Sequence, residues 1–153
     1  MNQRISILGS GWLGLPLAVE LISKGYKVNG STTSMIKVRE LEVQGITPFI
    51  IDTEDKLNNI SNFLCADVLI IAITSKNMSA FKNLIKKIEE SEVSKVLFVS
   101  STSVYANTNA MITEETDTNN SLLATIEKLF MTNSFFEFKT TFGIFLLIGF
   151  SYD

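Results

Sequence analysis

The chain of 153 residues contains no histidine and only one cysteine. Without histidine there can be no serine–histidine–aspartate triad and none of the usual zinc sites, and one cysteine cannot form a disulfide within the chain. Cys65 comes just before an apolar run. Since no histidine is present to activate its thiol, we interpret Cys65 as a small residue at the edge of the core.

An excess of one charge and long apolar runs are also missing. The net charge is -3, from 13 basic and 16 acidic residues, and the lysines are scattered along the chain. This pattern disfavours nucleic acid and anionic membranes as partners. No apolar run reaches the roughly 18 residues that a membrane helix needs, and the N-terminus lacks the pattern of a signal peptide. We therefore predict a cytoplasmic protein without a membrane partner.

Short runs rich in isoleucine and valine alternate with helical patterns along the chain. Such alternation predicts one domain built on a parallel α/β sheet. The run from Val68 to Ile73 is continuously apolar, which is typical of a central strand covered by helices on both faces. The predicted strands lie near residues 4 to 8, 26 to 32, 46 to 51, 67 to 74 and 95 to 101.

Two later segments carry apolar residues at helical spacing. The first runs from Phe81 to Ile88, and the second runs from Leu122 to Phe130 after a predicted cap at Asn120 or Ser121. The second helix returns the chain toward a sixth strand. We predict a Rossmann-like, doubly wound parallel sheet of about six strands in the order 3-2-1-4-5-6.

The segment Gly9-Ser10-Gly11-Trp12-Leu13-Gly14 lies between the first strand and a helix-like run. The first glycine permits a tight turn, the second lets the backbone approach a pyrophosphate, and the third allows close packing of helix on strand. The unpaired N–H groups of the helix would face the anion. Pro16 requires a helix that starts near Trp12 or Leu13. A turn that binds nothing is the alternative, but a strand one βαβ unit later favours a dinucleotide.

The second strand ends in hydroxyl groups at the place where NAD-preferring proteins have a carboxylate. Ser31-Thr32-Thr33-Ser34 stands about 20 residues after the glycines. A carboxylate there would repel a 2′-phosphate by about 1 to 4 kcal/mol, so its absence permits NADP. The hydroxyls of Ser31, Thr33 and Ser34 and the Lys37 ammonium can donate to a phosphate, and Ser34 is also expected to cap the next helix. We favour NADP over NAD.

The fifth strand ends in Ser100-Ser101-Thr102-Ser103-Val104-Tyr105. Together with the glycine segment, this run resembles the extended short-chain dehydrogenase/reductase superfamily of the NAD-dependent epimerase/dehydratase type. More narrowly, Gly-Trp-Leu-Gly-Leu-Pro-Leu-Ala at residues 11–18 is similar to an atypical bacterial branch, and the resemblance extends to about residue 141. Because ligands bind at the carboxyl ends of parallel strands, we also assign Ala72 and Ser100 to the cofactor site.

The resemblance implies an incomplete catalytic set. In the family, the residue that matches Ser101 hydrogen-bonds the reacting oxygen, and the residue that matches Tyr105 mainly shapes the pocket. Neither Tyr26 nor Tyr105 is followed four residues later by lysine, and Tyr152 is followed only by Asp153, so the family's Tyr-x-x-x-Lys pair is missing. Three functions remain open: an oxidoreductase- or epimerase-like enzyme acting on a sugar or other carbonyl compound, a dinucleotide-binding module without turnover, and a scaffold that binds no dinucleotide.

The C-terminal region is apolar, with seven of the eleven phenylalanines between Phe130 and Phe150. Members of the family continue into a C-terminal portion that closes over the substrate, which we expect to be absent here, through a truncation or an altered reading frame near residue 142. We divide the chain into a dinucleotide-binding domain at residues 1–141 and a tail at 142–153. The tail is either a buried sixth strand or an exposed edge through which copies associate.

Overall fold

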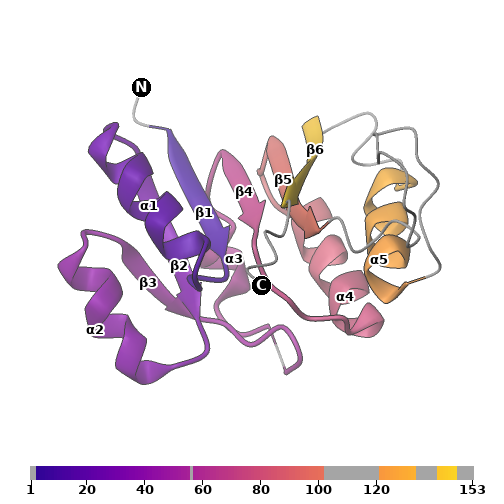
Figure 1. Ribbon diagram of the computed structural model, residues 1–153, viewed down its shortest axis with the longest axis horizontal. Helices are drawn as coiled ribbons and strands as arrows, with labels where there is room; N and C mark the ends of the chain where they lie inside the picture. The colour runs from indigo at the N-terminus through magenta and orange to yellow at the C-terminus, as the bar shows by residue number, and fades with distance from the viewer. Residues whose placement is uncertain (1–2, 56, 102–120, 134–140, 148–153) are drawn as a thin grey trace, which may run out of the picture.

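The computed structural model describes residues 3–55, 57–101, 121–133 and 141–147. Six parallel strands form one sheet in the order β3-β2-β1-β4-β5-β6 (Figure 1). This order confirms the predicted Rossmann-like topology. The strands are β1 (Arg4–Leu8), β2 (Lys27–Thr32), β3 (Thr47–Ile50), β4 (Val68–Ile71), β5 (Lys95–Ser101) and β6 (Thr141–Leu147).

The helices connect the strands and begin close to their predicted starts. Leu13 occupies the N-cap position of α1, and Pro16 lies in the first turn, where its missing N–H costs no helical hydrogen bond. Ser121, rather than Asn120, caps α5 by accepting a hydrogen bond from the backbone N–H of Ala124. The helices are α1 (Gly14–Ser23), α2 (Met35–Val43), α3 (Ile60–Phe63), α4 (Met78–Glu89) and α5 (Leu122–Met131).

Two hydrophobic clusters cover the two faces of the sheet. One packs α1 and α2 onto the strands and includes Ile70, whereas the other packs α3, α4 and α5 and includes Leu69 and Ile71. Successive side chains of a strand point to opposite faces, so the clusters lie on opposite sides of β4. The sheet is therefore doubly wound, and β4 is its buried centre as the apolar run predicts.

Two details differ from the sequence-based expectations. β4 ends at Ile71 instead of near residue 74, because the chain leaves the sheet there. Cys65 is exposed, and its thiol donates to the carbonyl oxygen of Ser61. The prediction of a core-edge cysteine is wrong because the core takes Leu64 and Ala66 on either side of it.

The strand β6 begins at residue 141, where the predicted tail follows the dinucleotide-binding domain. The strand lies at the edge of the sheet and pairs with β5 along its whole length, from Lys95 opposite Thr141 to Ser101 opposite Leu147.

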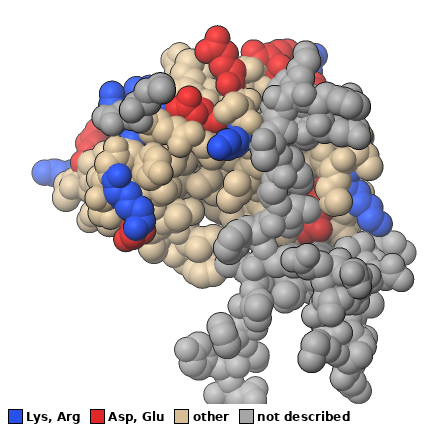
Figure 2. Space-filling model, turned by 90° about the horizontal axis from the view of Figure 1, so that it is seen from above, with Lys and Arg blue, Asp and Glu red and all other residues tan. Residues whose placement is uncertain are grey.

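Basic and acidic side chains are interspersed over the described surface seen in Figure 2. Within the described residues, no helix is long and apolar enough to cross a membrane.

Candidate functional site

The three glycines of the loop after β1 have three different surroundings. Gly9 has a positive φ of 100°, and a Cβ there would lie 2.7 Å from the carbonyl oxygen of Ala72. A Cβ on Gly14 would overlap the carbonyl oxygen of Gly9. In contrast, a Cβ on Gly11 would meet nothing within 4 Å. Gly9 and Gly14 are therefore required by the chain itself, whereas Gly11 leaves open space above the loop.

Ser31 of β2 holds this loop in place. The backbone N–H of Gly9 donates to Ser31 Oγ at 2.8 Å, and the N–H of Ser10 donates to the Ser31 carbonyl oxygen at 2.9 Å. Ser31 is buried, so its hydroxyl oxygen serves the loop inside the protein. Ser31 therefore positions the glycines of the loop.

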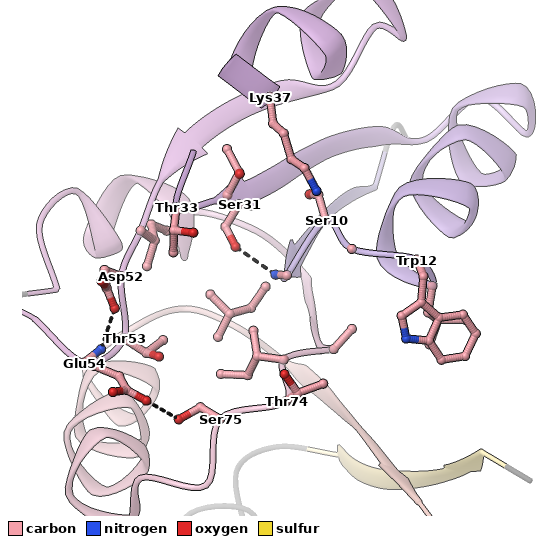
Figure 3. Close-up of a pocket in the computed structure, with 18 residues that line it drawn as sticks. Ser10, Trp12, Ser31, Thr33, Lys37, Asp52, Thr53, Glu54, Thr74 and Ser75 are labelled. Atoms are coloured by element: carbon pink, nitrogen blue, oxygen red, sulfur yellow. Dashed lines mark hydrogen bonds between the residues drawn. The ribbon is translucent and has the colours of Figure 1, made fainter. Parts of the chain in front are cut away.

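A cavity of about 510 Å³ opens beside the loop (Figure 3). It lies at the carboxyl ends of β1, β2, β3 and β4, which is where parallel sheets bind their ligands. Its volume is in the range of small-molecule sites. The predicted cofactor-binding residues that line it are Gly9, Ser10, Gly11, Trp12, Leu13, Ser31, Thr32, Thr33, Lys37 and Ala72.

Three predicted cofactor-binding residues do not line the cavity. Gly14 lies behind the loop, in the first position of α1. Ser34 occupies the N-cap position of α2 without a side-chain cap, contrary to the expectation that its hydroxyl caps this helix, and its backbone N–H donates to Thr32 Oγ1 instead. The Ser100 hydroxyl donates to the carboxylate of Glu127.

Sequence reasoning missed the part of the lining that follows β3 and β4, namely residues 51–54 and 73–75. The Asp52 carboxylate accepts a hydrogen bond from the N–H of Glu54 at 2.9 Å, and Ser75 Oγ donates to Glu54 Oε1 at 2.8 Å. These carboxylates lie across the cavity from Lys37 in Figure 3. The signal was available, because every strand of a parallel sheet ends at the same edge.

The predicted catalytic residues lie at or beyond the end of β5. Ser101 is the last residue of that strand, and Tyr105 lies outside the described residues. Among the described residues, no group of three or more histidine, cysteine or acidic side chains could hold a metal ion.

Glu127 is a buried acidic residue that sequence reasoning also missed. It occupies one position of the apolar stripe of α5, between Ile126 and Phe130, and is only 6% exposed. Burial raises the pKa of its carboxyl above the ordinary value of 4.5, and the hydrogen bond from Ser100 partly opposes this rise. The signal was a charged residue at a core position of an amphipathic helix.

A doubly wound parallel sheet with a glycine loop and an open cavity at the end of β1 defines a nucleotide-binding domain of the Rossmann type. Residues 4–125 match the family described as the NAD binding domain of 6-phosphogluconate dehydrogenase. Because this match spans most of the chain, the chain belongs to that family of NAD-binding domains. The predicted nicotinamide dinucleotide cofactor is thereby confirmed at the level of the family.

The chain is also similar to a curated relative and to solved structures. It is 28% identical over 129 residues to Protein YeeZ of Escherichia coli K12, which covers 76% of this chain and 47% of YeeZ. The chain thus spans about half the length of the curated relatives it matches.

Two solved epimerases show the same fold. The UDP-Glc/GlcNAc 4-epimerase of Campylobacter jejuni superposes with a TM-score of 0.81 at 15% identity, covering 94% of this chain and 53% of that one. The UDP-glucose-4-epimerase of Stenotrophomonas maltophila, solved with NAD, gives a TM-score of 0.77 at 17% identity, covering 93% and 52%. At this identity the likeness concerns the fold alone.

Proposed function

We propose that this chain is the NADP-binding domain of a protein related to nucleotide-sugar epimerases, dehydratases and reductases of the extended short-chain dehydrogenase/reductase superfamily. The observation that carries the proposal is the open space above Gly11, within a loop whose other two glycines are explained by the chain itself. A dinucleotide is the ligand that uses this space, because its pyrophosphate needs close backbone approach.

The start of α1 supplies the electrostatic part of the site. Its N-cap residue, Leu13, makes no side-chain cap, and the N–H of Leu15 donates to the Gly11 carbonyl oxygen at 3.1 Å, so the N–H groups left for an external acceptor are those that precede Leu15. Helix N-termini favour anions through these groups and through the helix dipole. The pyrophosphate would lie over Gly11 to Gly14, with Ser31 holding the loop beneath it.

NADP is favoured over NAD by the residues at the end of β2. Thr33 and Lys37 are exposed and line the cavity, and no carboxylate stands at this strand end to repel a 2′-phosphate. Asp52 and Glu54 line the opposite side, where Glu54 is engaged by Ser75. The side of the cavity that carries Lys37 is therefore the side where the ribose 2′ substituent is expected.

The single tryptophan of the chain provides the test. Trp12 lines the cavity and is 74% exposed, so energy transfer from its ring to a bound reduced nicotinamide can be followed directly. We expect saturable transfer with NADPH at lower concentration than with NADH. Equal affinity for the two would contradict the preference for NADP, and no binding of either would contradict the dinucleotide site.

The catalytic role remains a proposal with two forms. In the first, the nicotinamide approaches Ser101 and the protein performs redox or epimerase chemistry on a carbonyl or sugar substrate, with Tyr105 shaping the pocket. In the second, the chain binds dinucleotide without turnover. The second is favoured by α5, which has Lys128 but Ala124 in place of the tyrosine four residues earlier. Substrate-dependent NADPH oxidation that is lost in Ser101→Ala would establish the first form.

The proposal places this domain in the cytoplasm and allows copies to associate through β6. This strand lies at the edge of the sheet, and edge strands leave backbone groups for pairing. Light scattering of the purified chain tests the association, and a monomer at all concentrations would contradict it.

A further inference from the structure

Ser10 of the glycine loop has a hydroxyl without a partner. The residue is only 6% exposed, and its Oγ is the buried side-chain polar atom that lacks a hydrogen bond within the described part of the chain. Its backbone N–H is fixed on the Ser31 carbonyl oxygen at 2.9 Å. Buried hydroxyls are normally paired, because an unsatisfied one is costly, so this atom calls for a partner from outside the chain.

The position of this hydroxyl points to one part of a dinucleotide. Ser10 Oγ lies against β2, since a Cβ built on Gly30 would approach it to 2.9 Å. Gly30 therefore leaves the room that the Ser10 side chain occupies. The pyrophosphate belongs further along the loop, at the start of α1, whereas the end of β2 faces the ribose 2′ position. Ser10 is thus on the ribose side of the loop.

A cation shares this side of the cavity. Lys37 extends from α2 toward Ser10 in Figure 3, and both residues line the cavity. A hydroxyl donor beside an ammonium group is suited to an anionic oxygen, which forms stronger hydrogen bonds than a neutral one. The proposed contact requires rotation about the Cα–Cβ bond of Ser10, which turns Oγ away from β2.

Resting on the proposed dinucleotide site, we infer that Ser10 determines cofactor specificity by donating a hydrogen bond from its hydroxyl to the 2′-phosphate of NADP. Lys37 supplies the charge, and Ser10 supplies a directed donor beside it. The 2′-hydroxyl of NAD would gain less from the same pair, because it carries no charge.

The test compares Ser10→Ala with Ser23→Ala, a matched loss of one hydroxyl from an exposed residue at the end of α1 outside the cavity lining. Affinities for NADPH and NADH are measured by energy transfer from Trp12. We expect Ser10→Ala to weaken NADPH binding about tenfold, as for a lost hydrogen bond to a charged group, and to change NADH binding less than about twofold. Ser23→Ala should change neither affinity.

A second measurement separates ligand contact from a structural role. Without ligand, Ser10→Ala should unfold at the same temperature as the wild type or a higher one, because it removes an unpaired buried hydroxyl. A lower unfolding temperature would overturn the inference. So would equal weakening of NADPH and NADH, or unchanged NADPH affinity. If the wild-type chain binds neither dinucleotide, the proposed function itself fails, which the other outcomes do not imply.

Discussion

The ends of β1 and β5 carry the two functional motifs of the chain, and the structure uses them differently. At the end of β1, the glycine loop borders an open cavity and Gly11 faces free space. At the end of β5, the Ser100 hydroxyl is buried and engaged by Glu127 of α5. A hydroxyl at a strand end is thus not by itself a ligand group, because the helix packed above it can take the hydrogen bond first.

The difference reflects how each site is assembled. The glycine loop is one contiguous segment fastened by a single residue of the neighbouring strand, Ser31. The region after β5 depends on α5, a helix that packs against the strand end and brings a buried carboxylate with it. Four substitutions test this difference between the two strand ends, and they are described from the largest expected effect to the smallest.

The largest effect is expected for Gly11→Val. The side chain fits the empty protein but fills the space proposed for the pyrophosphate, so dinucleotide affinity should fall at least about 100-fold, or about 2.7 kcal/mol. Titration with NADPH measures the loss, and thermal unfolding shows whether the fold is intact. Unchanged affinity in a folded variant would place the ligand elsewhere.

Gly14→Ala should mainly lower folding stability, whereas Gly11→Val should mainly lower dinucleotide affinity. The added Cβ overlaps the Gly9 carbonyl oxygen, so α1 must shift away from its strand at a cost of about 1–3 kcal/mol of folding stability. Denaturant unfolding at several temperatures measures this cost. If Gly14→Ala is as stable as the wild type, Gly14 is not required for the packing of α1, and the separate roles given to Gly11 and Gly14 are wrong.

Lys37→Ala tests the charge on the ribose side of the cavity. NADPH affinity should fall about tenfold, or about 1.4 kcal/mol, at low ionic strength, with little change for NADH. The difference should shrink as salt is added, because the cation is exposed and screened. Lys82→Ala, which removes an exposed lysine of α4 outside the cavity lining, is the control and should change neither affinity.

Glu127→Gln addresses the other region through its pH dependence. Burial raises the folded-state pKa of Glu127 above 4.5, so the folded chain retains a proton that the unfolded chain has lost. The stability contributed by this group is complete below the unfolded pKa and is lost as pH rises through the folded pKa. The glutamine variant lacks this titration, so its stability relative to the wild type should increase with pH over that window. A pH-independent difference would contradict the buried carboxylate.

Local sequence signals predicted much of the fold and the part of the cavity lining that follows β1 and β2. Strand runs such as Val68–Ile71 owe their shape to burial on both faces, and the spacing of Gly9, Gly11 and Gly14 reflects backbone requirements that act within a few residues. Interactions of this range can be read along the chain. Asp52 and Glu54 carry no local motif, so only their place after β3, at the carboxyl edge that all parallel strands share, could have marked them as cavity residues.

The alternation of strands and helices and the glycine loop follow from the sequence alone, because periodicity and backbone freedom are local properties. Which polar side chains find a hydrogen-bond partner within the chain is visible only in the tertiary structure. It assigned Ser31 to the loop, Ser100 to Glu127 and left the Ser10 hydroxyl without a partner. Those assignments depend on which groups meet across strands and helices, and such meetings arise only when distant segments pack together.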